Sequence, residues 1–129
     1  MKNKCIFCKI IKGEIPAVKV WEDEKYFAFL DMRQIKPGHT LLIPKKHTDY
    51  LFDLDDKEYT QLMLKVKFLA KLLKNKLNAK RIGLMVEGFS IPHIHIHIVP
   101  LNKGGELSFY KAKLTNKEEL KKIAEKILK

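Results

Sequence analysis

The segment that most constrains this chain is a run of alternating histidines and isoleucines from His93 to His97, followed by Ile98, Val99 and Pro100. Alternation with β-branched residues is typical of a β-strand, because successive side chains of a strand point to opposite faces. Residues on the same face of a strand lie about 6.5–7 Å apart. We therefore expect the isoleucines to anchor one face in a core and the three imidazoles to share the other face, where they are available for chemistry.

The remaining patterns predict an α+β domain in which an antiparallel sheet of about five strands is covered by one long helix. The expected strands are Val18–Trp21, Tyr26–Leu30, His39–Ile43, Arg81–Val86 and the histidine segment, and a short N-terminal helix is expected over Cys5–Lys12. The sequence contains no linker or repeat. We expect a single domain over residues 1–129, with a core over about residues 3–100 and a C-terminal extension over about residues 101–129.

Capping signals predict the starts of the long helix and of a terminal helix. Asp55 is followed three residues later by Glu58, which is the spacing of a capping box at a helix N-terminus. Thr115 and Glu118 repeat this spacing near the C-terminus. Apolar residues at helical spacing are expected to face the core: Tyr59, Leu62, Val66, Leu69, Leu73 and Leu77 in the long helix, and Leu120, Ile123, Ala124 and Ile127 in the terminal one.

The formal net charge of +11 raises the question of nucleic-acid binding. The lysines are scattered along the sequence, however, and no basic stripe is interleaved with aromatic residues. We therefore expect a solvated lysine-rich surface that attracts polyanions in general, nucleotides included, and no specific nucleic-acid partner. No apolar run approaches the roughly 20 residues that span a membrane, and the N-terminus lacks a signal-peptide pattern, so we expect a cytoplasmic protein with no membrane partner.

The two cysteines, Cys5 and Cys8, are separated by two residues. A disulfide over so short a loop would stabilise the fold little, and a redox dithiol normally follows a strand, which is not predicted before Cys5. Half of a zinc site fits the spacing better, with histidines as the obvious further ligands. A reduced, metal-free pair is the alternative.

Two kinds of chemistry suit three imidazoles on one strand face. Two of them can ligate a catalytic metal ion, with a third ligand elsewhere. Alternatively, one neutral imidazole can attack phosphorus or an acyl carbon to form a covalent intermediate, while its neighbours donate hydrogen bonds to the oxygens on which charge develops. A nucleophilic imidazole needs its other ring nitrogen protonated and held by a carbonyl group. The residue types alone leave both chemistries open.

Four blocks in a fixed order extend the pattern over nearly the whole chain, up to about Pro100. They are Cys5–Pro16, Phe29–Asp31, Pro37–His47 and His93–Val99. Together they resemble the histidine triad (HIT) superfamily, and within it the Hint-like branch of nucleotide hydrolases. The resemblance implies a HIT-like fold and an enzyme that cleaves nucleotide conjugates at the α-phosphate through a nucleotidyl-histidine intermediate. Purine nucleoside phosphoramidates are the first expected substrates, and dinucleoside polyphosphates are the alternative.

The resemblance also implies roles for individual residues. His95, the middle histidine of the triad, corresponds to the nucleophile, and His97 and His39 correspond to histidines that contact the phosphate and the leaving group. Asp31 matches the acidic residue that binds the ribose hydroxyls, and Ser90 matches a serine that contacts phosphate. The apolar slot for the base corresponds to Ile6, Phe7, Ile10, Phe29 and Met32, with a plain core role as the alternative for Ile10 and Met32.

Members that keep both cysteines resemble a zinc-binding subset. Their ligands correspond to Cys5, Cys8, His47 and His93, and four protein ligands make a closed, structural zinc site. Such a site would also hold His93 in place beside the nucleophile. The resemblance further implies a two-fold homodimer, in which the long helix and the strand after Gly83 meet their partners and the two sheets join into one of about ten strands.

The chain departs from the family pattern in two places. The stretch Val86–Pro92 is shorter and lacks two amide side chains that help to hold phosphate and leaving group, which leaves the preferred leaving group open. A lysine-rich segment from Thr115 onward replaces the aromatic C-terminal tail of Hint proteins. Two other function classes stay open at this point: a metallohydrolase or oxygenase with its metal on the triad, and a non-catalytic module that senses nucleotides or binds nucleic acid.

Overall fold

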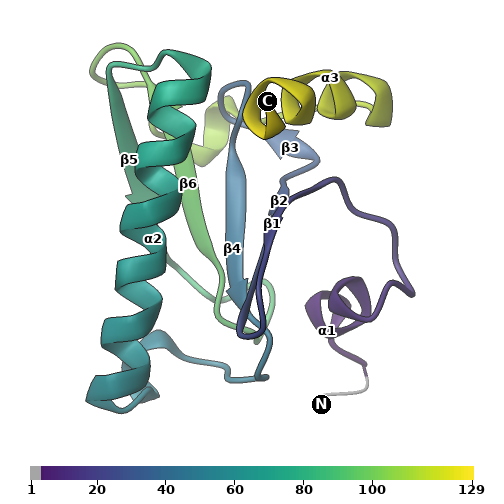
Figure 1. Ribbon diagram of the computed structural model, residues 1–129, viewed down its shortest axis with the longest axis vertical. Coiled ribbons are helices and arrows are strands. Elements are labelled where there is room, and N and C mark those ends of the chain that lie inside the picture. Colours follow the sequence, from purple (N-terminus) through teal and green to yellow (C-terminus); the bar gives the residue numbers. More distant parts are fainter. Residues whose placement is uncertain (1–3) are drawn as a thin grey trace.

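The computed structural model describes residues 4–129 and contains a five-stranded antiparallel sheet with helices on both faces (Figure 1). The strands follow the order β1-β2-β4-β6-β5, and their bounds are β1 Lys19–Glu22, β2 Tyr26–Leu30, β4 Thr40–Pro44, β5 Arg81–Met85 and β6 Ile96–Leu101. The predicted fold class and sheet are confirmed. Met1 to Asn3, which belong to the single domain expected over residues 1–129, lie outside the described residues. Within residues 4–129, no helix has both the length and the apolar character that crossing a membrane requires.

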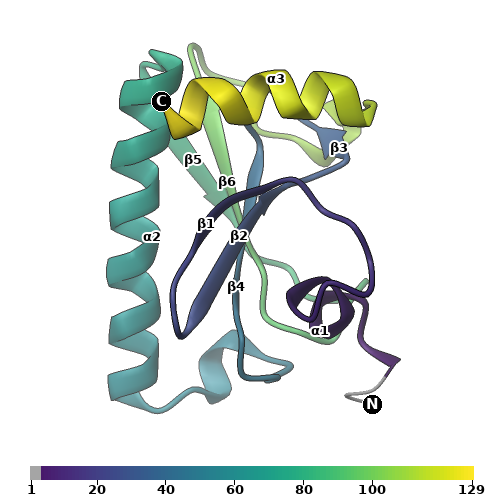
Figure 2. The same ribbon diagram turned by 45° about the vertical axis from the view of Figure 1, so that its right-hand side comes forward.

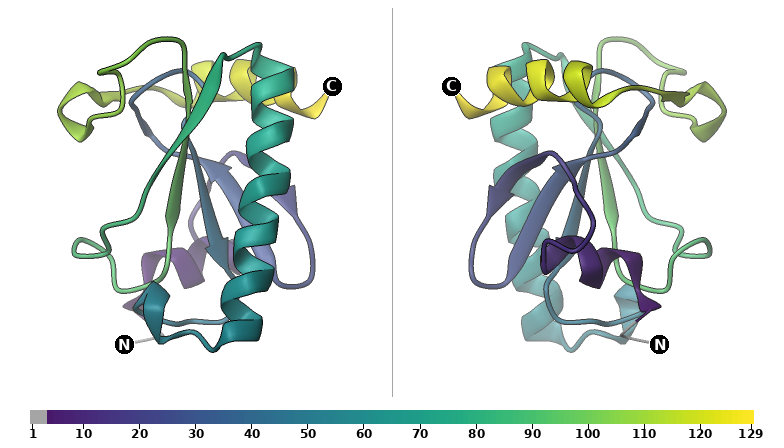
Figure 3. Two further views of the ribbon diagram at one scale, coloured as in Figure 1. Left: turned by 90° about the vertical axis from the view of Figure 1, so that its left-hand side faces the viewer. Right: turned by 90° about the vertical axis from the view of Figure 1, so that its right-hand side faces the viewer.

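The long helix α2, Asp56–Leu77, packs across one face of the sheet (Figure 3). Asp55 caps it as predicted, because its carboxylate accepts a hydrogen bond from the Glu58 N–H at 2.7 Å. The side chains at this interface are at most 3% exposed: Leu62, Val66, Leu69 and Leu73 from α2, and Ile94, Ile96 and Ile98 from the histidine segment. Burying each such side chain stabilises the fold by about 1.5–3 kcal/mol. The helix therefore fixes the isoleucine face of β6 against the core.

The opposite face of the sheet carries the imidazoles and is covered in part by α1, Ile6–Ile11 (Figure 3). Phe7 of α1 packs edge-on against His95, with 5.0 Å between the ring centroids, and against Phe29 of β2, with 5.7 Å between them. The prediction that histidines and isoleucines point to opposite faces is confirmed.

The strand of the histidine segment begins later than predicted, at Ile96 instead of His93. The preceding residues direct their backbone N–H groups elsewhere. His93 donates to the oxygen of Ile91 at 2.9 Å, and Ile94 donates to the oxygen of Thr48 at 2.8 Å. These bonds belong to a turn and to the loop after β4, so only the second half of the segment joins the sheet.

The C-terminal segment folds back onto the sheet and forms structure that was only partly predicted. A second, small sheet pairs β3, Arg33–Gln34, with β7, Lys113–Leu114. The helix α3, Lys117–Leu128, then lies across the end of the sheet at which α2 ends (Figure 2). Two short 3₁₀ helices complete the described elements, η2 at Leu51–Asp53 and η3 at Phe109–Lys111.

The predicted cap of the terminal helix is wrong by one residue. Asn116, and not Thr115, caps α3, since its side chain accepts a hydrogen bond from the Glu119 N–H at 2.9 Å. The Thr115 N–H instead donates to the oxygen of Met32 at 2.9 Å and so continues the pairing of β3 with β7. The buried face of α3 agrees with the prediction: Leu120, Ala124 and Ile127 are buried, and Ile123 is partly buried.

Candidate functional site

A pocket of about 810 Å³ opens on the imidazole face of the sheet. It is bounded by α1, by the end of β2 and by residues 87–91, and apolar side chains form most of its wall, as in small-molecule sites. Of the residues predicted to form the site, all but His39 line it: Ile6, Phe7, Ile10, Phe29, Asp31, Met32, Ser90, His95 and His97. The fold therefore brings together residues that are separated by up to 91 positions in the sequence.

His95 is held by a hydrogen bond that fixes which ring nitrogen carries the proton. Its Nδ1 lies 2.8 Å from the main-chain oxygen of His93. A carbonyl oxygen can only accept, so Nδ1 is the donor and the lone pair of the neutral ring is on Nε2. This is the tautomer that the sequence analysis requires of a nucleophilic imidazole.

His39 and His97 form a hydrogen-bonded pair beside the pocket. The Ile35 N–H donates to Nδ1 of His39 at 3.1 Å, so the ring proton of neutral His39 is on Nε2. That Nε2 lies 2.9 Å from Nδ1 of His97 and donates to it, which places the ring proton of His97 on its own Nε2. Burial lowers the pKa of His39 to about 4 and that of His97 to about 4, so both rings are neutral at pH 7.

The two members of this pair differ in their access to the pocket. His97 lines the pocket, whereas His39 is 1% exposed and does not line it. The family resemblance implies that both contact the phosphate side of a substrate. The structure places His39 behind the ring of His97, with which it forms a hydrogen bond.

Asp31 follows β2 and faces the histidine pair. Its Oδ2 lies 3.6 Å from Nε2 of His39 and 4.0 Å from Nδ1 of His97, while its Oδ1 accepts the Arg33 N–H at 2.9 Å. Burial raises the pKa of the Asp31 carboxyl, and the Arg33 N–H bond and the neighbouring His97 oppose this effect. The carboxylate retains acceptor capacity on the side that faces the pocket, because an ionised carboxylate offers about four lone pairs.

The same three residues bring ligand atoms within 4.8 Å of one another, a spacing that a metal ion needs. The hydrogen bonds argue against a metal there. Nε2 of His39 carries the ring proton and donates a hydrogen bond to Nδ1 of His97, so neither nitrogen has a free lone pair for a metal ion. The arrangement is a chain of oriented imidazoles, which weighs against the alternative of a catalytic metal on the triad.

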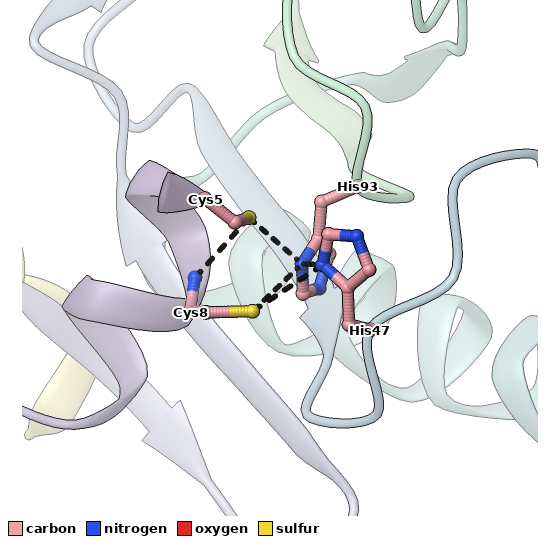
Figure 4. A group of neighbouring side chains, drawn as sticks. All are labelled: Cys5, Cys8, His47 and His93. Atoms are coloured by element: carbon pink, nitrogen blue, oxygen red, sulfur yellow. Dashed lines mark hydrogen bonds between the residues drawn. The ribbon is translucent and has the colours of Figure 1, made fainter. Parts of the chain in front are cut away.

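A second cluster, formed by Cys5, Cys8, His47 and His93, has the composition and size of a zinc site (Figure 4). The four side chains converge from α1, from the loop after β4 and from the segment before β6 (Figure 4). Nδ1 of His93 lies 3.3 Å from Sγ of Cys5 and 3.6 Å from Sγ of Cys8, and Nδ1 of His47 lies 3.3 Å from Sγ of Cys8. The two Nδ1 atoms are 3.2 Å apart.

These separations fit tetrahedral zinc. With Zn–N bonds near 2.05 Å and Zn–S bonds near 2.3 Å, two nitrogen ligands should lie about 3.3 Å apart, nitrogen and sulfur about 3.6 Å apart, and two sulfur atoms about 3.8 Å apart. Nε2 of His93 donates to the oxygen of Pro44 at 2.8 Å, which leaves the lone pair on the Nδ1 that faces the sulfur atoms. The donor set, the spacing and the tautomer of His93 are all compatible with a metal ion.

Several residues of the pocket were not predicted. Phe109 lies edge-on to His97, with 4.9 Å between the ring centroids, and Arg33, Glu87 and Lys117 also line the wall. Leu120 was predicted as core and also reaches the pocket. The pairing of β3 with β7 and the docking of α3 bring Arg33, Phe109, Lys117 and Leu120 to the site, and the sequence carries no signal for either arrangement.

Comparison with known proteins finds a family and its members. The HIT domain family model matches residues 12–104. The adenosine 5'-monophosphoramidase HNT1 of Saccharomyces cerevisiae is 36% identical over 127 residues, which cover 96% of this chain and 80% of that protein. A Hit-like protein involved in cell-cycle regulation from Bartonella henselae superposes with a TM-score of 0.84 at 35% identity, over 98% of this chain and 95% of that one. A Zn-bound histidine triad family protein from Mycobacterium smegmatis superposes with a TM-score of 0.78 at 30% identity, over 98% of this chain and 95% of that one.

Proposed function

Because the chain belongs to the HIT domain family, we propose that it is a nucleotide-conjugate hydrolase that cleaves at the α-phosphate through a nucleotidyl intermediate on His95. Purine nucleoside phosphoramidates are the proposed substrate class, and the similarity to a yeast adenosine 5'-monophosphoramidase supports this choice. The observation that carries the proposal is the 2.8 Å hydrogen bond between Nδ1 of His95 and the oxygen of His93. It leaves Nε2 as the lone-pair nitrogen of a residue that lines the pocket.

In the proposed reaction, Nε2 of His95 attacks phosphorus, the bond from phosphorus to the leaving amine breaks, and the amine takes up a proton from solvent, which the water of the second step returns. Water then attacks the same phosphorus, the bond to Nε2 breaks, and the products are a nucleoside monophosphate and a free amine. Two displacements replace one difficult step. His97 presents a protonated Nε2, and its proposed role is to donate a hydrogen bond to a phosphate oxygen or to the leaving group as charge develops. Ser90, at the rim of the pocket, is the further proposed phosphate contact.

The nucleoside is proposed to lie between α1 and the end of β2. Phe7 and Phe29 offer two buried aromatic faces for a base, and Ile6, Ile10 and Met32 add apolar surface on either side. None of these side chains carries an amide that could read the edge of a base, so we propose that purines are accepted with little discrimination. The carboxylate of Asp31 is the proposed acceptor for the ribose hydroxyls.

Zinc is the metal that we propose for the cluster of Cys5, Cys8, His47 and His93. With all four positions taken by protein ligands, the ion would supply rigidity and no open site for substrate. The solved structure of a Zn-bound family member supports this proposal. His93 would then be held by the metal through its ring while its main-chain oxygen holds Nδ1 of His95.

We also propose a homodimer built on the free edge of the sheet at β5. This strand ends the strand order and has one neighbour, β6. Leu84 is 42% exposed on it, and Val86 directly after it is 44% exposed. An apolar strand edge is a surface that proteins usually cover.

The test is to mix the protein with adenosine phosphoramidate, quench at millisecond times and measure the intact mass and the released AMP. We expect a transient mass increase of one adenylyl group, mapped to the peptide that contains His95, and steady release of AMP. His95→Asn should remain folded by circular dichroism, form no adduct and lose roughly a thousandfold or more in kcat. Diadenosine tetraphosphate in a parallel reaction decides whether the leaving group is an amine or a nucleoside phosphate.

Two results would contradict the proposal. One is normal turnover by His95→Asn. The other is AMP release by the unmodified protein with no adduct at any time and with inversion at a chirally labelled phosphorus. Double displacement predicts retention of configuration, and direct attack by water predicts inversion.

A further inference from the structure

We propose that Gln34 is a positioning residue for this reaction: its side-chain amide holds Asp31 and His39 in the geometry through which they serve the substrate and His97. The inference rests on the proposed function for the roles of Asp31 and His39. It adds a residue that does not line the pocket and that no sequence pattern singles out. Gln34 lies in β3 and is 8% exposed.

The amide of Gln34 uses all of its hydrogen-bonding capacity on one loop, residues 31–39. Nε2 donates to the main-chain oxygen of Asp31 at 2.6 Å and to that of His39 at 2.8 Å. Oε1 accepts from the N–H of Gly38 at 2.8 Å and from the N–H of His39 at 3.2 Å. One side chain therefore connects the two ends of the loop that carries the proposed ribose acceptor and the buried histidine.

The orientation of the amide follows from its partners. Nε2 faces two carbonyl oxygens and Oε1 faces two N–H groups, so a flipped amide would place like groups together at all four contacts. The backbone conformation of the loop is also constrained at Gly38. Gly38 has φ +107°, in the region that favours glycine, and a Cβ at this position would collide with the side chain of Leu77.

The four hydrogen bonds of Gln34 affect the pocket through His39 and through Asp31. Gln34 fixes the backbone of His39, and the next residue, Ile35, donates to its ring. The oriented ring of His39 then donates to Nδ1 of His97 and keeps the proton of His97 on Nε2, the nitrogen proposed to face the substrate. Gln34 also fixes the main chain of Asp31, whose Oδ2 lies 3.6 Å from Nε2 of His39. Loss of the hydrogen bonds of Gln34 should therefore change both ribose recognition and the tautomer of His97.

The experiment compares Gln34→Glu, Gln34→Met and the unmodified protein. Glutamate keeps the two acceptor contacts but turns two donor contacts into repulsions between oxygen atoms, and methionine keeps the volume and loses all four bonds. Val66→Ala, a cavity in the core beneath α2, is the matched control for lost stability. The readouts are kcat/KM for ribose and 2′-deoxyribose substrates, and the ¹⁵N shifts of the ring nitrogens of His97.

We expect both Gln34 variants to lose roughly tenfold to a hundredfold in kcat/KM for the ribose substrate and to lose most of the preference for ribose. The ¹⁵N shifts of His97 should move from one protonated and one lone-pair nitrogen toward an average of two tautomers. Val66→Ala should keep the ribose preference and the His97 shifts of the unmodified protein. If the Gln34 variants fold and keep both, Gln34 has only a structural role and the inference fails.

Measurements on the unmodified protein keep the inference testable if neither variant folds. The side-chain amide protons of Gln34 should exchange with solvent at least tenfold more slowly than those of Gln61, the other glutamine of the chain, whose side chain lies at the surface and accepts from Lys25. Equal exchange rates would show that the amide of Gln34 is not held by these hydrogen bonds and would overturn the inference. The exchange and tautomer measurements need no turnover, so an inactive protein would contradict the proposed function and leave Gln34 to be judged on these data.

Discussion

Replacement of Asp31 should separate the proposed recognition of ribose from the proposed chemistry at His95. In the proposed complex the carboxylate accepts hydrogen bonds from the ribose hydroxyls, and a bond to a charged group contributes about 1.5–3 kcal/mol. A 2′-deoxy substrate loses one such bond. At 1.4 kcal/mol for each factor of ten, the unmodified protein should prefer ribose about tenfold to 150-fold in kcat/KM.

Two variants should lower the preference for ribose to different extents. Asp31→Asn keeps the shape and an oxygen acceptor but no charge, so the remaining bond is worth about 0.5–1.5 kcal/mol and the preference should fall to about twofold to tenfold. Asp31→Ala should bring the two substrates to nearly equal kcat/KM. The adenylyl adduct on His95 should still form in both variants, because Nδ1 of His95 is held by the oxygen of His93 and not by Asp31.

Asp31→Asn should weaken ribose recognition but should not lower the stability of the protein without substrate. Burial raises the pKa of Asp31, so the folded state is penalised for ionising this carboxyl. For an acid with a raised folded-state pKa, stability is lost as the pH rises from the unfolded pKa, near 4, through the folded value. We therefore expect the Tm of Asp31→Asn to equal or exceed that of the unmodified protein at pH 7, and this advantage to vanish as the pH falls toward 4.

The reasoning would be refuted by equal cleavage of ribose and 2′-deoxyribose substrates by the unmodified protein. It would also be refuted if Asp31→Asn lowered the Tm at pH 7 while the ribose preference stayed intact. The carboxylate would then be a structural partner of the loop and not a substrate contact.

Three other predictions concern the metal, the assembly and the C-terminal segment. Protein made with zinc present should contain one equivalent of zinc by elemental analysis, and a chelator should lower its Tm, because the metal binds the folded state preferentially; protein free of metal under these conditions would contradict the site. Light scattering at micromolar concentration should give the mass of a dimer, and Leu84→Lys at the edge strand should shift it toward the monomer. Glu106→Gln should lower the Tm at pH 7, because hydrogen bonds from the N–H of Asn102, from Lys36 and from the N–H of Lys103 lower the pKa of Glu106 to about 2; this difference in Tm should close as the pH falls from about 4.5 toward 2, and a gap independent of pH would exclude the charge as its cause.

The sequence predicted those parts of the fold that depend on local patterns. Alternation in the histidine segment predicted which side chains share a face, and the capping pair Asp55 and Glu58 predicted the start of α2. Both are properties of neighbouring residues. The start of β6 at Ile96 was missed because Ile94 donates to Thr48, a residue 46 positions earlier, and no local pattern encodes that bond.

The candidate site divides in the same way. The family resemblance was sufficient to identify nine lining residues, but it gave no indication that His39 lies behind His97 or that Phe109 lies beside it. The position of Phe109 depends on β7, two residues long, which pairs with β3 about 80 positions earlier. A pairing of two residues has too little sequence signal to be predicted before the fold is known.

His93 connects the proposed structural metal site with the proposed nucleophile, His95. Its ring faces the two cysteines, its Nε2 donates to Pro44, and its main-chain oxygen accepts from His95. With ring and carbonyl both tied, the peptide group of His93 has little freedom to rotate, and the acceptor that keeps the proton on Nδ1 of His95 stays in place. His95 lies two residues further on, directly before β6, where its Nδ1 reaches this oxygen at 2.8 Å. A ligand that lay on a separate loop would give the metal the same stability but would leave the orientation of the nucleophile to be fixed by other contacts.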